Sequence, residues 1–141
     1  MIAKKVTSKN ITIMKYFTLQ ELTRTGTNLQ NVPDAQAEKN LIALIEKVLE
    51  PIRILWGTPI KINSGFRNIA VNKAVGGAVN SQHLKGQAAD ITAGSPAENK
   101  KLFDLISKSG IVFDQLIDEQ KYKWLHISFN ENGNRKQILH L

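Results

Sequence analysis

At 141 residues, the chain is long enough to form one domain with a real hydrophobic core. It has no cysteine, which excludes disulfides and thiolate metal ligands, and it has no apolar stretch as long as a membrane span. The net charge of +7 favours polyanionic partners, but the basic residues are scattered in short pairs, so a solvated basic surface is the simpler interpretation.

Residues 1–15 alternate apolar and polar side chains without a continuous apolar core. We therefore expect an N-terminal extension, either flexible or adding an edge strand, and no signal peptide. Residues 16–141 are predicted to form a single domain. A chain without a signal peptide would be made in the cytoplasm, so action at a cell wall would require another means of delivery.

The first half of the domain is predicted to be helical. Thr18 and Glu21 have the spacing of a capping box, which predicts a short helix ending near Gly26. After a loop, apolar residues at helical spacing predict a long helix over residues 34–55. Pro51 lies inside that helix and should kink or restart it.

Strands dominate the second half. In chain order, the patterns predict a strand at 60–63, a helical turn at 68–74, an irregular loop carrying Ser81 and His83, a strand at 87–92, a helix from Ser95 to about Ser107, and strands at 113–118 and 124–129. The last two strands should form an antiparallel hairpin. The predicted class is therefore α+β, with a small, mostly antiparallel sheet packed with helices.

Two short segments contain the residues that could bind a metal. Only three histidines occur in the chain: His83 and His126 lie in these segments, and His140 lies in the C-terminal tail. With Asp90, they provide two imidazoles and one carboxylate, a set that can hold a catalytic zinc and leave one position open. Gly86 permits a tight turn between His83 and the strand that carries Asp90.

Strand alternation predicts how the second histidine is presented. Trp124, His126 and Ser128 should share one face of their strand, while Leu125 and the other apolar residues face the core. A histidine that faces away from an apolar stripe and lies beside a tryptophan suits the wall of a cleft.

Each residue also has a purely structural interpretation. A lone buried histidine is more often a hydrogen-bonded core residue, Ser81 could cap a loop, and Asp90 could cap a turn or a helix. The joint pattern, with glycine and alanine between the polar positions, favours the metal site.

The segments Ser81-x-His83-x-x-Gly86-x-Ala88-x-Asp90 and Trp124-x-His126 resemble the signature of the zinc D-alanyl-D-alanine peptidases, the M15 peptidase family. Asn63–Arg67, Val71-Asn72 and Phe113–Glu119 also match, so the resemblance extends from about Phe17 to Phe129. The family includes carboxypeptidases, dipeptidases and phage endolysins that cut peptidoglycan stem peptides. The resemblance implies the fold shared by these peptidases and the hedgehog signalling domain, and it suggests a phage or prophage origin.

The resemblance implies one zinc per chain, held by His83, Asp90 and His126. Arg67 would hold the carbonyl oxygen of the scissile bond as it gains charge, and would help to bind the substrate. Ser81 and Trp124 are further candidate substrate-binding residues. A structural salt bridge is the alternative role for Arg67.

The general base is where the sequence departs from the family. Many relatives have an acidic residue three positions before the last histidine, where this chain has Lys123, and others have a histidine where it has Trp124. We predict that Glu119 replaces the usual base, with Asp118 as the second candidate. Either carboxylate could instead be a solvated turn residue.

Three functions from different classes stay open. The favoured function is a zinc metallopeptidase, a D-Ala-D-Ala carboxypeptidase or endolysin-type endopeptidase, acting as a monomer on peptidoglycan stem peptides. The second is a zinc-bearing binding domain without catalysis. The third, a nucleic-acid-binding domain, is supported by charge alone, so we expect no nucleic-acid partner.

Overall fold

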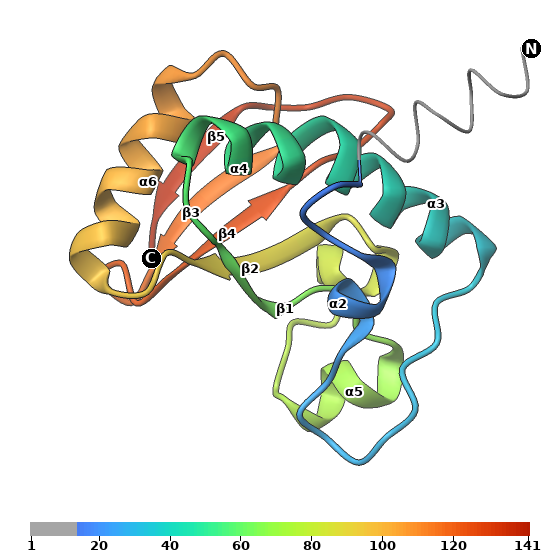
Figure 1. Cartoon of the computed structure of the whole chain (residues 1–141). Coiled ribbons are helices and arrows are strands. Elements are labelled where there is room, and N and C mark those ends of the chain that lie inside the picture. Colours follow the sequence, from blue (N-terminus) through green and yellow to red (C-terminus); the bar gives the residue numbers. More distant parts are fainter. Residues whose placement is uncertain (1–13) are drawn as a thin grey trace, which may run out of the picture.

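The computed structural model describes residues 14–141 (Figure 1), so most of the predicted N-terminal extension lies outside the described residues. The helical elements are α2 (Leu19–Thr23), α3 (Ala35–Leu44), the π-helical turn η1 (Ile45–Leu49), α4 (Glu50–Trp56), α5 (Ile69–Ala74), the 3-10 turn η2 (Gln82–Lys85) and α6 (Pro96–Lys108). The strands are β1 (Lys61–Ser64), β2 (Ala88–Thr92), β3 (Gln115–Glu119), β4 (Trp124–Ser128) and β5 (Gln137–His140).

The strands form one mixed sheet in the order β1-β2-β4-β3-β5. The β1–β2, β2–β4 and β4–β3 pairs are antiparallel, and β5 pairs in parallel with β3. The predicted α+β class and the hairpin of β3 and β4 are confirmed. The hairpin turn contains Gln120, Lys121 and Tyr122, all with positive φ, a backbone conformation typical of tight turns.

The predicted long helix is continuous in space but changes its winding. Asp34 caps its start by accepting a hydrogen bond from the Ala37 N–H, and the π turn η1 separates α3 from α4. Pro51 lies in the first turn of α4, where its missing N–H is tolerated. The predicted restart at Pro51 therefore takes the form of a π turn rather than a break in the chain.

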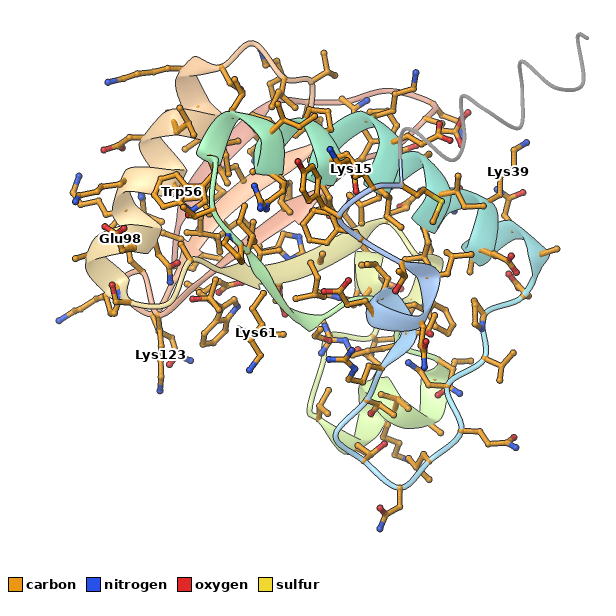
Figure 2. The ribbon with its side chains drawn as sticks, viewed as in Figure 1. Lys15, Lys39, Trp56, Lys61, Glu98 and Lys123 are labelled. Carbon is orange, nitrogen blue, oxygen red and sulfur yellow. The ribbon has the colours of Figure 1, made fainter. Side chains whose placement is uncertain are left out.

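The core lies between this long helix and the sheet. Figure 1 shows α3 and α4 crossing one face of the sheet, with α6 beside them and α2 and α5 near the end of β1. Figure 2 shows Trp56 at the end of α4, on the side of the helix near α6. Leu125 and Ile127 are fully buried in this core, so His126, which alternates with them on β4, projects from the other face of the sheet.

The C-terminal strand β5 is the strand that the sequence patterns did not predict. It brings His140 against Asp118, which is buried on β3, and the imidazole and carboxylate form a hydrogen bond. Asp118 is therefore not the solvated turn residue that the sequence allowed.

Within residues 14–141, none of the helices is both long and apolar enough to cross a lipid bilayer.

Candidate functional site

His83, Asp90 and His126 come together, as the spacing predicted. His83 lies in η2, Asp90 on β2 and His126 directly opposite it on β4. The Asp90 Oδ1 atom lies 3.3 Å from His83 Nε2 and 3.4 Å from His126 Nδ1. The three donor atoms all lie within 4.8 Å of one another, so these three residues could hold a metal ion. They are called the metal-binding group below.

The separations of these atoms fit a zinc ion better than direct hydrogen bonds. Two ligand atoms about 2.0–2.1 Å from a tetrahedral zinc lie about 3.3 Å apart. A charge-assisted hydrogen bond would be shorter, about 2.7–2.9 Å. In addition, His126 Nε2 is buried and has no hydrogen-bond partner among residues 14–141, so this ring is not held as a hydrogen-bonded core histidine would be.

The ring of His83 is oriented by the loop that follows β1. Its Nδ1 atom lies 2.7 Å from the Gly65 carbonyl oxygen, and the Nδ1–H donates to it, which leaves the Nε2 lone pair facing Asp90. Glycine is required at position 65 for a separate contact, because a Cβ atom there would come within 2.3 Å of the Leu22 carbonyl oxygen. The candidate metal ligand His83 is thus held by a second layer of contacts.

The turn η2 itself is closed at both ends. The Ser81 hydroxyl accepts a hydrogen bond from the His83 N–H, so Ser81 caps the turn, as one sequence interpretation allowed. Gly86 ends it with a φ of 73° and packs so closely on α3 that a Cβ would lie 2.4 Å from the Ala37 carbonyl oxygen. Only glycine fits this left-handed position and this contact.

The electrostatics of the site keep Asp90 ionised. Burial alone would raise the pKa of Asp90, but its polar contacts with His126 and His83 outweigh burial and hold that pKa well below the usual range. An ionised carboxylate beside two imidazoles is the protonation state that metal binding requires.

Arg67 lies in the same cleft, and none of the carboxylates in residues 14–141 forms a salt bridge with it. Its backbone N–H donates to the His83 carbonyl oxygen, which ties the two loops together. Its Nε atom is buried, and no partner for it occurs in the part of the chain that the structure describes. Burial lowers the pKa of Arg67, and the charge of Asp90 opposes this effect. These contacts argue against the structural salt bridge.

The two candidate bases lie on opposite faces of β3. Gln115, Ile117 and Glu119 line the cleft with the metal-binding group, whereas Asp118 faces away and pairs with His140. Burial raises the pKa of Glu119, partly opposed by His126. Lys123 is exposed and points away from the protein body (Figure 2), so it does not occupy the cleft.

The cleft has a volume of about 570 Å³ and extends across the sheet. It contains the metal-binding group, Arg67, Ser81, Glu119 and Trp124, so every site residue predicted from the sequence except the second candidate base, Asp118, lines it. Other side chains in its wall, which the sequence analysis did not single out, include Asn80, Gln82, Gln115 and Arg135.

Comparison with known proteins supports this arrangement. The family model described as Peptidase M15 matches residues 15–128. The chain belongs to the peptidase M15 family. A zinc D-Ala-D-Ala carboxypeptidase of Streptomyces albus G is 38% identical over 81 residues. That match covers 56% of this chain but only 32% of the relative, so the chain spans about a third of its length.

The family and this relative point to zinc as the metal, and the donor set of two imidazoles and one carboxylate agrees. In this M15 family member, the position three residues before His126 is a lysine, and Glu119 at the end of β3 places a second carboxylate in the cleft besides Asp90. The individual roles of the cleft residues stay predictions, as does the hedgehog-type fold.

Asp114 is the second charged centre of this family member. The Nε and Nη2 atoms of Arg135 donate to its two carboxylate oxygens at 3.0 and 2.8 Å, and the side-chain amide of Gln82 donates at 2.8 Å. The hydrogen bond from Arg135 lowers the pKa of Asp114 to about 2, against the effect of burial. Because Gln82 precedes the candidate metal ligand His83, this network links the C-terminal segment to the candidate metal site.

Proposed function

We propose that the chain is a zinc metallopeptidase that hydrolyses peptide bonds of peptidoglycan stem peptides at the bacterial cell wall. The observation that carries this proposal is the spacing of His83, Asp90 and His126 in one cleft with the Arg67 guanidinium and the Glu119 carboxylate. When bound, zinc would polarise the scissile carbonyl and make water a better nucleophile.

The residues of the chain have separate tasks in this proposal. Glu119 accepts a proton from the attacking water and passes it to the leaving amine. Arg67 donates hydrogen bonds to the carbonyl oxygen as it becomes negative. Trp124 offers an apolar wall for the peptide, and the Ser81 hydroxyl, which accepts from His83, still has its own proton to donate to the substrate.

Purified protein tests the proposal through two measurements. We expect zinc-loaded protein to release fragments from a stem peptide and a chelator to stop the reaction. Fragment masses identify the bond: loss of a terminal D-alanine indicates a carboxypeptidase, and internal cleavage indicates an endolysin-type endopeptidase, which would accord with a phage origin. Zinc binding without any cleavage would contradict the enzymatic proposal.

That last outcome would favour the second candidate, a zinc-bearing binding domain without catalysis. One observation supports this candidate: the position three residues before His126 is an exposed lysine instead of the acidic residue common in the family. The presence of Glu119 and Arg67 in the cleft opposes it.

Replacing Arg67 by alanine should lower kcat by about 100-fold, because an oxyanion donor is lost while the fold stays intact. Arg67→Lys should restore little activity, since one ammonium cannot replace the planar guanidinium. Steady-state kinetics with zinc content as a control checks this. An unchanged kcat with a raised KM would instead assign Arg67 to substrate positioning.

A further inference from the structure

Arg135 is an arginine of the cleft to which neither the sequence motifs nor the proposed mechanism gives a role. It lies just before β5, at the edge of the sheet opposite β1, whereas Arg67 follows β1. The cleft therefore has one guanidinium toward each edge of the sheet. A peptide bound across the strands would pass from Arg67 and the metal-binding group toward Arg135.

The guanidinium of Arg135 is held in a fixed orientation. Its Nε and Nη2 atoms both bind Asp114, whose side chain is only 4% exposed, and its backbone N–H also donates to Asp114 Oδ1 at 3.0 Å. The following residues, Lys136 and Gln137, donate backbone hydrogen bonds to the carbonyls of Phe113 and Asp114. The segment is thus fixed to the start of β3.

This geometry leaves part of the guanidinium free. Five N–H groups are available on arginine, and those on Nη1 are not used by Asp114. The Arg135 side chain is 58% exposed and belongs to the cleft wall, so these donors are open to a ligand. A donor group whose orientation is already fixed loses little entropy when it binds.

The charge of the cleft favours an anion. Its wall contains Arg67 and Arg135 against Asp90 and Glu119, with Asp114 behind Arg135. Adding the zinc that the family implies gives four positive and three negative charges, an excess of one positive charge. Guanidinium groups match the planar geometry of carboxylates especially well.

We propose that Arg135 is a specificity residue that binds a carboxylate of the substrate peptide. This inference rests on the proposed function and names the feature that the cleft selects. A stem peptide has two such groups, the free carboxylate of its D-glutamate and its C-terminal carboxylate. Both have the same chemistry, so the experiment must separate them.

Two matched pairs of stem peptides make this separation. One pair differs only in D-glutamate against its carboxamide, and the other in a free against an amidated C-terminus. We expect zinc-loaded wild-type protein to prefer the acid of one pair by about tenfold in kcat/KM, mainly through KM. Arg135→Gln should bring this preference close to one, mainly by raising the KM for the acid.

Three variants complete the test. Lys108→Gln removes one positive charge from an exposed site at the end of α6, outside the cleft, and should keep the preference. Arg135→Lys keeps the charge but not the planar guanidinium, and should retain only part of the preference for the acid. Asp114→Asn leaves Arg135 in the chain without its bidentate carboxylate partner and should also weaken the preference for the acid. This variant keeps the test possible if Arg135→Gln folds poorly.

Calorimetric binding of the same peptides separates this inference from the proposed function. If no peptide is cleaved, the proposed function fails, but tighter binding of the acid that disappears in Arg135→Gln would still support carboxylate recognition. Equal kcat/KM and equal affinity for acid and amide in both pairs would overturn the inference. A preference that survives in Arg135→Gln would overturn it as well.

Discussion

Glu119→Gln should reduce turnover of a stem peptide by a factor of about 10²–10⁴ and leave zinc bound. Glutamine keeps the shape of the side chain but cannot accept a proton, and a positioned base is worth a factor of this size. Glu119 ends β3 opposite Trp124 and lines the cleft together with the metal-binding group. Single-turnover kinetics and zinc analysis of the same samples measure both effects.

The dependence on pH gives a second measurement of the same residue. A carboxylate acts as a base only when ionised, so the rate should fall as the pH drops through the Glu119 pKa. Because burial raises the pKa of Glu119, this fall should begin above the usual carboxylate value of about 4.3. The corresponding inflection should disappear in Glu119→Gln.

Asp118→Asn is the matched control, because it changes the neighbouring carboxylate on the opposite face of the same strand. Turnover should stay nearly unchanged. The free energy of unfolding should fall, since Asp118 is buried and pairs with His140. A large loss of turnover in Asp118→Asn with a silent Glu119→Gln would show that the base has been assigned to the wrong residue.

Local patterns predicted most of the fold because most elements carry their own signals. The cap at Thr18 and the alternation along β4 each depend on neighbouring residues, and each of these elements begins where expected. The formation of β5 depends instead on long-range contacts. Its parallel pairing with β3 and the hydrogen bond of His140 with Asp118 join residues far apart in the sequence, and its four residues show no clear alternation of apolar and polar side chains.

The site residues also differ in whether local sequence patterns or long-range contacts place them. His83, Asp90 and His126 could be predicted because glycine and alanine between them leave a recognisable spacing, and the structure brings the three together. Arg135 could not be predicted, because only the clamp between its segment and β3 brings it into the cleft. A single arginine in a polar tail gives no signal of that contact.

His126→Ala should abolish zinc binding, lowering the metal content from about one equivalent per chain to near zero, and should reduce peptide hydrolysis to background. Three protein donors are the usual minimum for a catalytic zinc, and this substitution leaves only His83 and Asp90. Elemental analysis of protein purified without chelator measures the occupancy. Full occupancy in His126→Ala would contradict the assigned ligand set.

The third histidine of the chain provides the control for this experiment. His140 pairs with Asp118, which faces away from the cleft, so His140→Ala should keep about one zinc per chain. A ligand that binds only the folded state stabilises it, so a chelator should lower the Tm of the wild type and of His140→Ala. It should leave the Tm of His126→Ala unchanged, because that variant has no bound metal to lose.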